Sequence, residues 1–218
     1  MNGLLVVWDS RDVFLWGAAN TLSLVLGCLL LSIPIGILGA VVLTEAPDPL
    51  RRLFAEAVDL LRCVPFLLLA YVVYYGLPEL GLRLDPWWAG LMSLTVYTTA
   101  YLAEIFRAAF RAVAPDNIEA AHAFGLSRSL IYRRIILPQV AITAAPVIGN
   151  QVITTIRDSA LLMIITVQEL TFAANFVSAN HFTPFAPFAA AVGLYLLMSF
   201  VVEAGVRRME RVRKLRYG

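Results

Sequence analysis

The chain has 218 residues, of which 60% are hydrophobic and 15% are charged, and its mean hydropathy is +0.78. This composition excludes an ordinary soluble domain, and the basic residues behind the net charge of +2 lie between apolar runs instead of forming a nucleic-acid-binding stripe. Since a helical span takes roughly 20 apolar residues, the length leaves room for about four to six spans in one membrane domain, residues 1–218.

The first two apolar runs predict two spans. No charged residue occurs from Val13 to Thr44, which predicts a tilted helix over residues 13–44. The next run, which ends at Pro78, is short for a span. We therefore expect the second helix to start near Glu56 and to cover residues 56–77.

The third run opens on two tryptophans, which are frequent at membrane interfaces, and predicts a span over residues 87–112. Glu104 and Arg107 lie near its end. Because they are three positions apart, they share one face of the helix, and we expect a structural ion pair between them.

The fourth span is predicted over residues 136–165 and contains the adjacent charges Arg157 and Asp158. Neighbours on a helix point about 100° apart, so we expect either a break in this span or pairing of both charges with other helices. The polar segment with Asn180 and Pro184 is interpreted as a loop, and residues 187–207 supply the fifth span.

Lys and Arg are concentrated in the segments that follow spans one, three and five. Cytoplasmic loops carry such an excess, so this distribution predicts an N-terminus outside and a C-terminal tail in the cytoplasm. Arg213, Lys214 and Arg216 belong to that basic tail, which we interpret as an orientation signal near anionic lipid.

The longest polar interval, residues 115–138, lies between spans three and four on the predicted cytoplasmic side. Asp116 or Asn117 can cap a first short helix, and Gly125 can end it in a left-handed conformation. Ser127 can then cap a second helix that runs to the proline at the end of the interval. Such a thin helical projection is suited to insertion into the cleft of another protein.

The spacing within this interval resembles the EAA loop of ABC-importer permeases. The matching positions are Glu119, Ala120, Ala121, Gly125, Leu137 and Pro138, and the resemblance implies that they couple the chain to an ATPase. It also implies an all-α fold of the type I ABC importer permease, a polytopic membrane bundle of about five helices. We call residues 115–138 the coupling loop.

Flanking segments are similar to the branch that takes up polar amino acids of the histidine, arginine and glutamine type. The similar segments are 17–22, 62–78 and 100–107. Two positions depart from the family pattern: Asp116-Asn117 replaces Gly-Gln before the EAA element, and residues 157–161 read Arg-Asp-Ser-Ala-Leu where Lys-Asp-Thr-Ser-Leu is common. The second departure falls in a region that the resemblance associates with substrate.

The resemblance implies a multi-pass subunit of the bacterial cytoplasmic (inner) membrane that is not itself an enzyme. The sequence has no G-x-x-x-x-G-K-[ST] loop, so ATP and Mg are expected on a separate ABC ATPase dimer. The other implied partners are a second permease chain, identical or paralogous, and an extracytoplasmic amino-acid-binding protein. No cofactor is expected on this chain, and His122 and His181 have no partner at metal-ligand spacing.

Intramembrane polar residues mark the candidate substrate pathway, because charges in hydrocarbon are costly. These residues are Asp158, Ser159, Arg157 and Glu169. The alternative reading is that Arg157 and Asp158 brace a dimer interface. A secondary transporter driven by an ion gradient, with Asp158 as an ion ligand, is the alternative function. The sequence leaves open which polar amino acid, basic or not, is carried.

Overall fold

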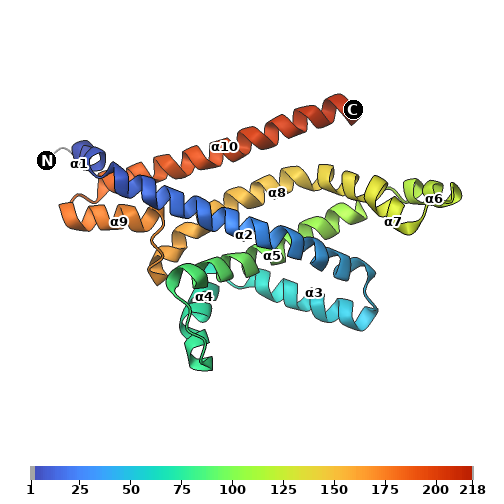
Figure 1. Cartoon of the computed structure of the whole chain (residues 1–218), viewed down its shortest axis with the longest axis horizontal. Helices are drawn as coiled ribbons and strands as arrows, with labels where there is room; N and C mark the ends of the chain where they lie inside the picture. The colour runs from blue at the N-terminus through green and yellow to red at the C-terminus, as the bar shows by residue number, and fades with distance from the viewer. Residues whose placement is uncertain (1–2, 218) are drawn as a thin grey trace.

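The computed structural model describes residues 3–217, and within this range the chain is folded into helices without strands (Figure 1). The predicted all-α class is thus confirmed. The α-helices are α1 (Gly3–Asp9), α2 (Arg11–Glu45), α3 (Asp48–Cys63), α4 (Phe66–Tyr71), α5 (Pro86–Arg111), α6 (Pro115–Ala123), α7 (Arg128–Ile131), α8 (Leu137–Ser159), α9 (Leu170–His181) and α10 (Phe185–Tyr217). Two π-helical segments, η1 (Val72–Gly76) and η3 (Tyr132–Ile136), and two 3-10 segments, η2 (Leu77–Leu80) and η4 (Ala160–Ile165), connect them.

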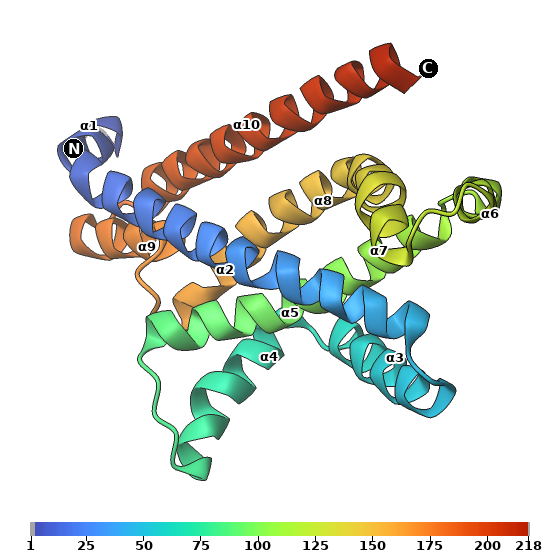
Figure 2. The same cartoon turned by 45° about the vertical axis from the view of Figure 1, so that its right-hand side comes forward.

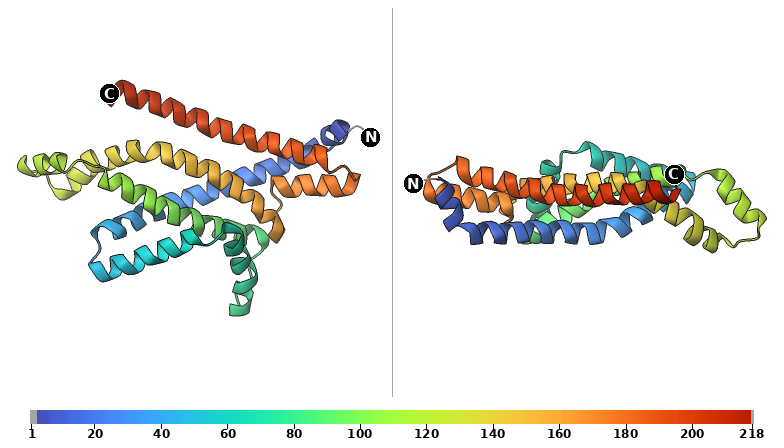
Figure 3. Two further views of the ribbon diagram at one scale, coloured as in Figure 1. Left: turned by 180° about the vertical axis from the view of Figure 1, so that it is seen from behind. Right: turned by 90° about the horizontal axis from the view of Figure 1, so that it is seen from above.

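The long helices α2, α5, α8 and α10 run roughly along the long axis of the molecule (Figures 1 and 3). The short helices α1 and α9 lie at one end of it, whereas α6, α7 and the end of α10 lie at the other. Figure 2 shows α2 crossing α5, against which it packs along much of its length. We call these two ends of the molecule the α9 end and the α6 end.

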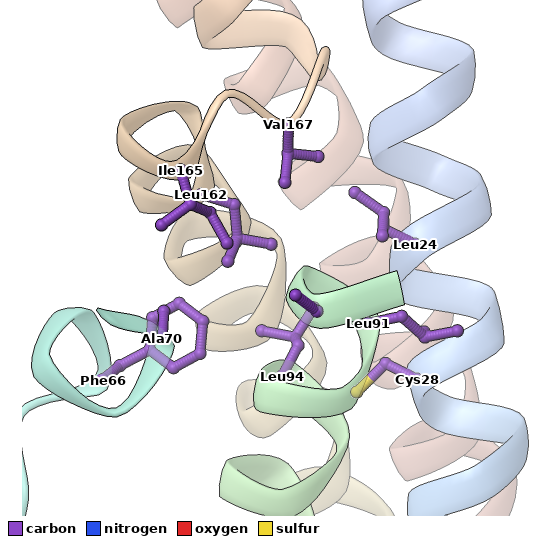
Figure 4. Packing of buried hydrophobic residues seen from close by; sticks show 10 residues of the cluster. Leu24, Cys28, Phe66, Ala70, Leu91, Leu94, Leu162, Ile165 and Val167 are labelled. Atoms are coloured by element: carbon purple, nitrogen blue, oxygen red, sulfur yellow. The ribbon is translucent and has the colours of Figure 1, made fainter. Parts of the chain in front are cut away.

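Close packing between helices holds the bundle together. A Cβ added at Gly36 of α2 would lie only 2.8 Å from the Cβ of Leu102 on α5, so the two backbones approach closely there. Near the α9 end, α2, α4, α5 and η4 share a core that includes Leu24, Leu94 and Leu162, all fully buried (Figure 4). Since lipid tails are as apolar as leucine, these contacts stabilise the fold mainly through packing.

Three helical segments are long and apolar enough to cross a membrane: α2, the run Arg128–Ile165, and the Phe185–Met209 part of α10. The bent pair formed by α3 and the segment Phe66–Leu80 is a fourth candidate. Helix α5 covers the third predicted span, but it is less apolar than these segments. Its many buried positions explain the lower hydropathy, because a helix surrounded by protein need not present an apolar surface to lipid.

The continuous helix expected over residues 56–77 is wrong. The chain bends by 102° between α3 and the segment that begins at Phe66. Val64, at the bend, is extended, as residues before proline usually are, and Pro65 has no N–H with which to continue the helix. Arg62 therefore lies at the end of a separate helix, where the carbonyls of the last turn are left open for other partners.

The loop interpretation of the segment before span five is also wrong, because residues 170–181 form α9. Its buried residues Leu170, Ala173, Ala174 and Val177 follow helical spacing and pack between α2 and α10. Helix α10 begins at Phe185 and its backbone continues to Tyr217, beyond the predicted end at 207. The side chains of the basic tail residues Arg213, Lys214 and Arg216 lie outside the described part of the structure.

Candidate functional site

The coupling loop forms a projection at the α6 end of the molecule (Figure 1). Glu119 and Ala120 are exposed on α6, whereas Ala121 is buried. Gly125 ends the helix with φ of +72°, and Leu126 N–H donates to the Ala121 carbonyl at 3.1 Å. This pattern is the Schellman motif, in which a left-handed glycine lets the chain reverse. The loop therefore presents one polar face of a short, defined helix.

The predicted start of the first short helix and the predicted end of the second are wrong. Helix α6 begins at Pro115 with Ala114 at the cap position, so Asp116 and Asn117 lie inside its first turn and cap nothing. Proline suits the first helical position because its φ is already helical. The second helix does not stop at Pro138: it passes through the π turn η3 directly into α8, and Pro138 occupies the first turn of α8.

Apolar contacts fix the coupling loop to the ends of α5 and α8. Ala121 of α6 and Ile131 of α7 are buried in one cluster with Phe106 and Ala109 of α5. Leu137, which follows η3, is 40% exposed and stands outside this cluster. A displacement of α6 must therefore move the neighbouring ends of α5 and α8 as well, since a packed core transmits strain.

The adjacent charges of the fourth span point to different neighbours. Arg157 is exposed and lines a cavity of about 350 Å³ that it shares with Asn150 of α8 and Glu203 of α10. Asp158 is half-buried, and its part of α8 packs against α5 next to Tyr97, since the hydroxyls of Thr155 and Thr98 are 3.3 Å apart. Neither side chain forms an ion pair with any other residue that the structure describes.

Neither the expected helix break nor the expected ion pairing accounts for these charges, because α8 continues through both of them without a break. Helix α8 is regular through Asp158, and at Ala160 it tightens into the 3-10 segment η4, which ends at the left-handed Thr166. Ser159 is fully buried, and its hydroxyl donates to the carbonyl of Ile156 at 2.7 Å. The Ser159 hydroxyl thus hydrogen-bonds within its own helix.

A row of polar groups continues from Asp158 along α5 toward the α6 end. The hydroxyl groups of Tyr97 and Tyr101 are 3.3 Å apart, and the Tyr101 hydroxyl also donates to the Arg62 carbonyl at 3.2 Å. The guanidinium of Arg62 lies over the Tyr101 ring, 5.4 Å from its centre, and bonds the Asp59 carboxylate at 3.2 Å. The break after α3 makes the Arg62 carbonyl available for this contact.

Glu104 and Arg107 form the ion pair that their spacing predicts. Arg107 Nε donates to both carboxylate oxygens, at 2.9 and 3.0 Å, and its Nη2 donates at 2.5 Å. Beside the pair lies a cavity of about 380 Å³ between α3, α5 and α8, lined in part by Arg62, Glu104 and Thr143. The row of polar groups therefore ends at an open cavity of ligand size.

Glu169 is fully buried at the α9 end, where it caps α9. Its carboxylate accepts hydrogen bonds from the N–H groups of Thr171 and Phe172, both at 2.8 Å, and from the Tyr195 hydroxyl at 2.5 Å. It also lines a cavity of about 200 Å³ together with Trp16 and neighbouring residues. Both oxygens of this carboxylate nevertheless accept hydrogen bonds from within the chain.

Sequence reasoning missed Tyr97, Tyr101, Arg62 and Tyr195. A local signal existed for the first two, which are four positions apart and therefore share a helix face. Arg62 and Tyr195 join the site through contacts distant in sequence, which no local pattern indicates. Among the described residues, no group of three or more metal-ligating side chains comes together.

Comparison with known proteins identifies the family. The model of the family "Binding-protein-dependent transport system inner membrane component" matches residues 32–214. The chain is similar to the probable glutamine ABC transporter permease protein GlnM of Bacillus subtilis, with 32% identity over 206 residues, 94% of this chain and 95% of the relative. It is also similar to the histidine/lysine/arginine/ornithine transport system permease protein HisQ of Salmonella typhimurium, with 33% identity over 212 residues and 92% of each chain covered.

Solved structures agree with this result. An amino acid ABC transporter crystallised with histidines matches with a TM-score of 0.88 and 26% identity, over 95% of this chain and 97% of that one. The inward-facing methionine ABC transporter MetNI matches with a TM-score of 0.71 at 19% identity, over 94% of this chain and 93% of that one, a likeness of fold alone. The resemblance to ABC-importer permeases is thus confirmed, and the chain belongs to the family of inner membrane components of binding-protein-dependent transport systems.

Proposed function

We propose that this permease subunit moves a polar amino acid, such as glutamine or a basic amino acid, into the cytoplasm. The exposed coupling loop carries the proposal, because it offers a rigid docking helix on a translocation subunit whose ATPase is a separate protein. The named substrates of the relatives, glutamine for one and histidine, lysine, arginine and ornithine for the other, support the substrate class. Family membership does not favour a transporter driven by an ion gradient.

The proposed assembly has two permease chains, two ATPase subunits that hold ATP and Mg, and an extracytoplasmic amino-acid-binding protein. Exposed Glu119 and Ala120 would contact the ATPase, while buried Ala121 anchors α6 and Gly125 shapes the turn. Leu137 and Pro138 belong to the start of α8, which carries the motion onward. In this arrangement the α6 end and the C-terminus lie in the cytoplasm, and the N-terminus lies outside.

The proposed substrate pathway follows Asp158, Tyr97 and Tyr101. Asp158 has no ionic partner among the described residues, so its carboxylate can bind the ammonium or cationic end of an amino acid. Tyrosine rings offer further stabilisation to a cation. We place Glu169 beside the pathway, as a residue that holds its outer turn, because both of its oxygens are already bonded.

Arg157 keeps two roles open within this proposal. Its position in a cavity shared with Glu203 of α10 favours bracing between α8 and α10 or between permease chains. Its neighbour Asp158 points about 100° away around the helix and favours the pathway. Variants of the two residues should therefore have different effects: changes at Asp158 alter substrate affinity, and changes at Arg157 alter assembly.

The first experiment reverses a charge on the coupling loop. Glu119→Lys should lower substrate-stimulated ATP hydrolysis and uptake severalfold in membranes that contain the permease, its ATPase and its binding protein, since the reversed charge faces the ATPase. Glu79→Lys is the matched control, because it makes the same charge change at an exposed residue distant from the loop. Unchanged uptake in Glu119→Lys would show that this face does not dock.

The second experiment tests the pathway. Asp158→Asn should weaken uptake of lysine or arginine more than uptake of glutamine, because it removes a negative charge and retains a hydrogen-bonding side chain of similar size. The measurement is uptake against concentration for each amino acid. Equal effects on all three substrates, or none, would assign Asp158 to bracing. Uptake that continues without the ATPase would instead point to a secondary transporter.

A further inference from the structure

A polar contact joins the coupling loop to the first long helix, α2. The last residue of α2, Glu45, accepts a hydrogen bond on one carboxylate oxygen from Arg128 Nη2 at 2.5 Å. Its other oxygen accepts one from the Tyr132 hydroxyl at 2.7 Å. Arg128 and Tyr132 are four positions apart, on one face of the helix that leads into α8, so two donors from one helix hold both oxygens of the carboxylate.

The dipoles of α2 and α7 disfavour the charges of Glu45 and Arg128 at these positions. A carboxylate at the C-terminal end of α2 and a guanidinium in the first turn of α7 each face the unfavourable end of their own helix. Local helix stability therefore does not account for either residue. The contact between them does, because each charge offsets the unfavourable placement of the other.

The first third of α2 is also tied to a turn, through Asn20 and Thr21. Asn20 Nδ2 donates to the Gln168 carbonyl at 2.8 Å, and the Thr21 hydroxyl accepts from Leu170 N–H at 3.1 Å. These contacts hold the turn that follows η4, next to Glu169. With a rise of 1.5 Å per residue, α2 separates this turn from Glu45 by about 36 Å. Helix α2 thus contacts the coupling loop through its last residue and the turn at the α9 end through Asn20 and Thr21.

We infer that Glu45 is a positioning residue that couples the coupling loop to α2, and through α2 to the turn at residues 168–170. The inference rests on the proposed function, because it assumes that an ATPase displaces the coupling loop. Arg128 and Tyr132 hold the loop in register with α2, so a displacement of α6 and α7 shifts α2 together with α8. Without this link, α2 is joined to the loop only through the apolar contacts of Ala40 in the same buried cluster, so less of the displacement reaches α2.

The test is a charge exchange in the complete importer, reconstituted in liposomes with its ATPase and binding protein. Glu45→Arg and Arg128→Glu should each lower the amount of amino acid taken up per ATP hydrolysed about fivefold, which converts to about 1 kcal/mol. The double variant should restore most of the loss because it re-forms the pair in the opposite sense. Arg133→Glu, an exposed arginine of the same loop with no ion pair in the structure, is the matched control.

A second variant separates coupling from assembly. Tyr132→Phe removes one hydroxyl and should lower uptake per ATP while the ATPase co-purifies with the permease in normal amount. Failure of the exchange to restore coupling, or normal coupling in both single variants, would overturn the role of Glu45. If the wild-type importer itself neither takes up amino acids nor shows stimulated ATP hydrolysis, the proposed function fails instead, so the two failures are distinguishable.

Discussion

Because α8 and α10 pack closely, replacing glycine by alanine should lower the stability of the protein at Gly149 and raise it at Gly193. A Cβ added at Gly149 of α8 would overlap the Cγ2 of Val206 on α10 and lie 3.3 Å from its Cβ. A Cβ added at Gly193 of α10 would meet nothing within 4 Å. Both substitutions to alanine gain helix propensity of about 0.8–1.0 kcal/mol. Only Gly149→Ala adds an overlap, and overpacking of this kind costs about 1–3 kcal/mol.

The two variants should therefore differ by the cost of the overlap. Thermal unfolding of the purified permease in detergent measures this difference, at about 2–4 °C for each kcal/mol in a chain of this size. Adding Val206→Ala to Gly149→Ala should recover stability beyond the sum of the single effects, because it removes the overlapping methyl groups. Equal melting temperatures for Gly149→Ala and Gly193→Ala, or strictly additive effects, would refute the close approach of the helices.

Three further substitutions test local structure. Glu169→Ala leaves two backbone N–H groups without an acceptor and removes one of the two hydrogen bonds of the Tyr195 hydroxyl, and should lower stability by about 2–4 kcal/mol in thermal unfolding. Gly125→Val forces a β-branched residue into φ of +72° at a strain of about 1–2 kcal/mol. It should clearly reduce co-purification of the ATPase but lower the melting temperature only slightly. Asp85→Ala removes the side-chain cap that accepts from the N–H groups of Trp87 and Trp88, and should cost about 1 kcal/mol in the same unfolding assay.

Hydropathy predicted the helical class, but local backbone chemistry decided where helices break. Pro65 lies inside the predicted second span, and its missing N–H produces the bend between α3 and α4. The opposite error occurred at α9, where Asn180 and Pro184 suggested a loop. The stripe from Leu170 to Val177 at helical spacing was already present in the sequence and should have outweighed them.

The side-chain contacts that join distant helices could not be predicted from the sequence. Glu45 and Arg128 are 83 positions apart, and Asn20 and Gln168 are 148 positions apart. Neither pair leaves a periodic pattern, because each depends on how whole helices pack. The end of α6, in contrast, has a local signal: Gly125 was predicted to stop the first short helix in a left-handed conformation, and its φ is +72°.

The continuity of the fourth span links the two halves of the proposed mechanism. From Arg128 to Asp158 the chain remains helical through α7, η3 and α8, a path of about 45 Å at 1.5 Å per residue that bends between α7 and α8 (Figure 2). The helix tightens only after Asp158, and the run ends at the left-handed Thr166. Helix α8 from Leu137 to Asp158 is about 32 Å long, so a tilt of about 10° about one of its ends moves the other by about 5.5 Å. Because α8 joins the coupling loop to Asp158, the proposed mechanism requires only a small tilt imposed at α7 to move the carboxylate relative to α5, and no helix has to unfold.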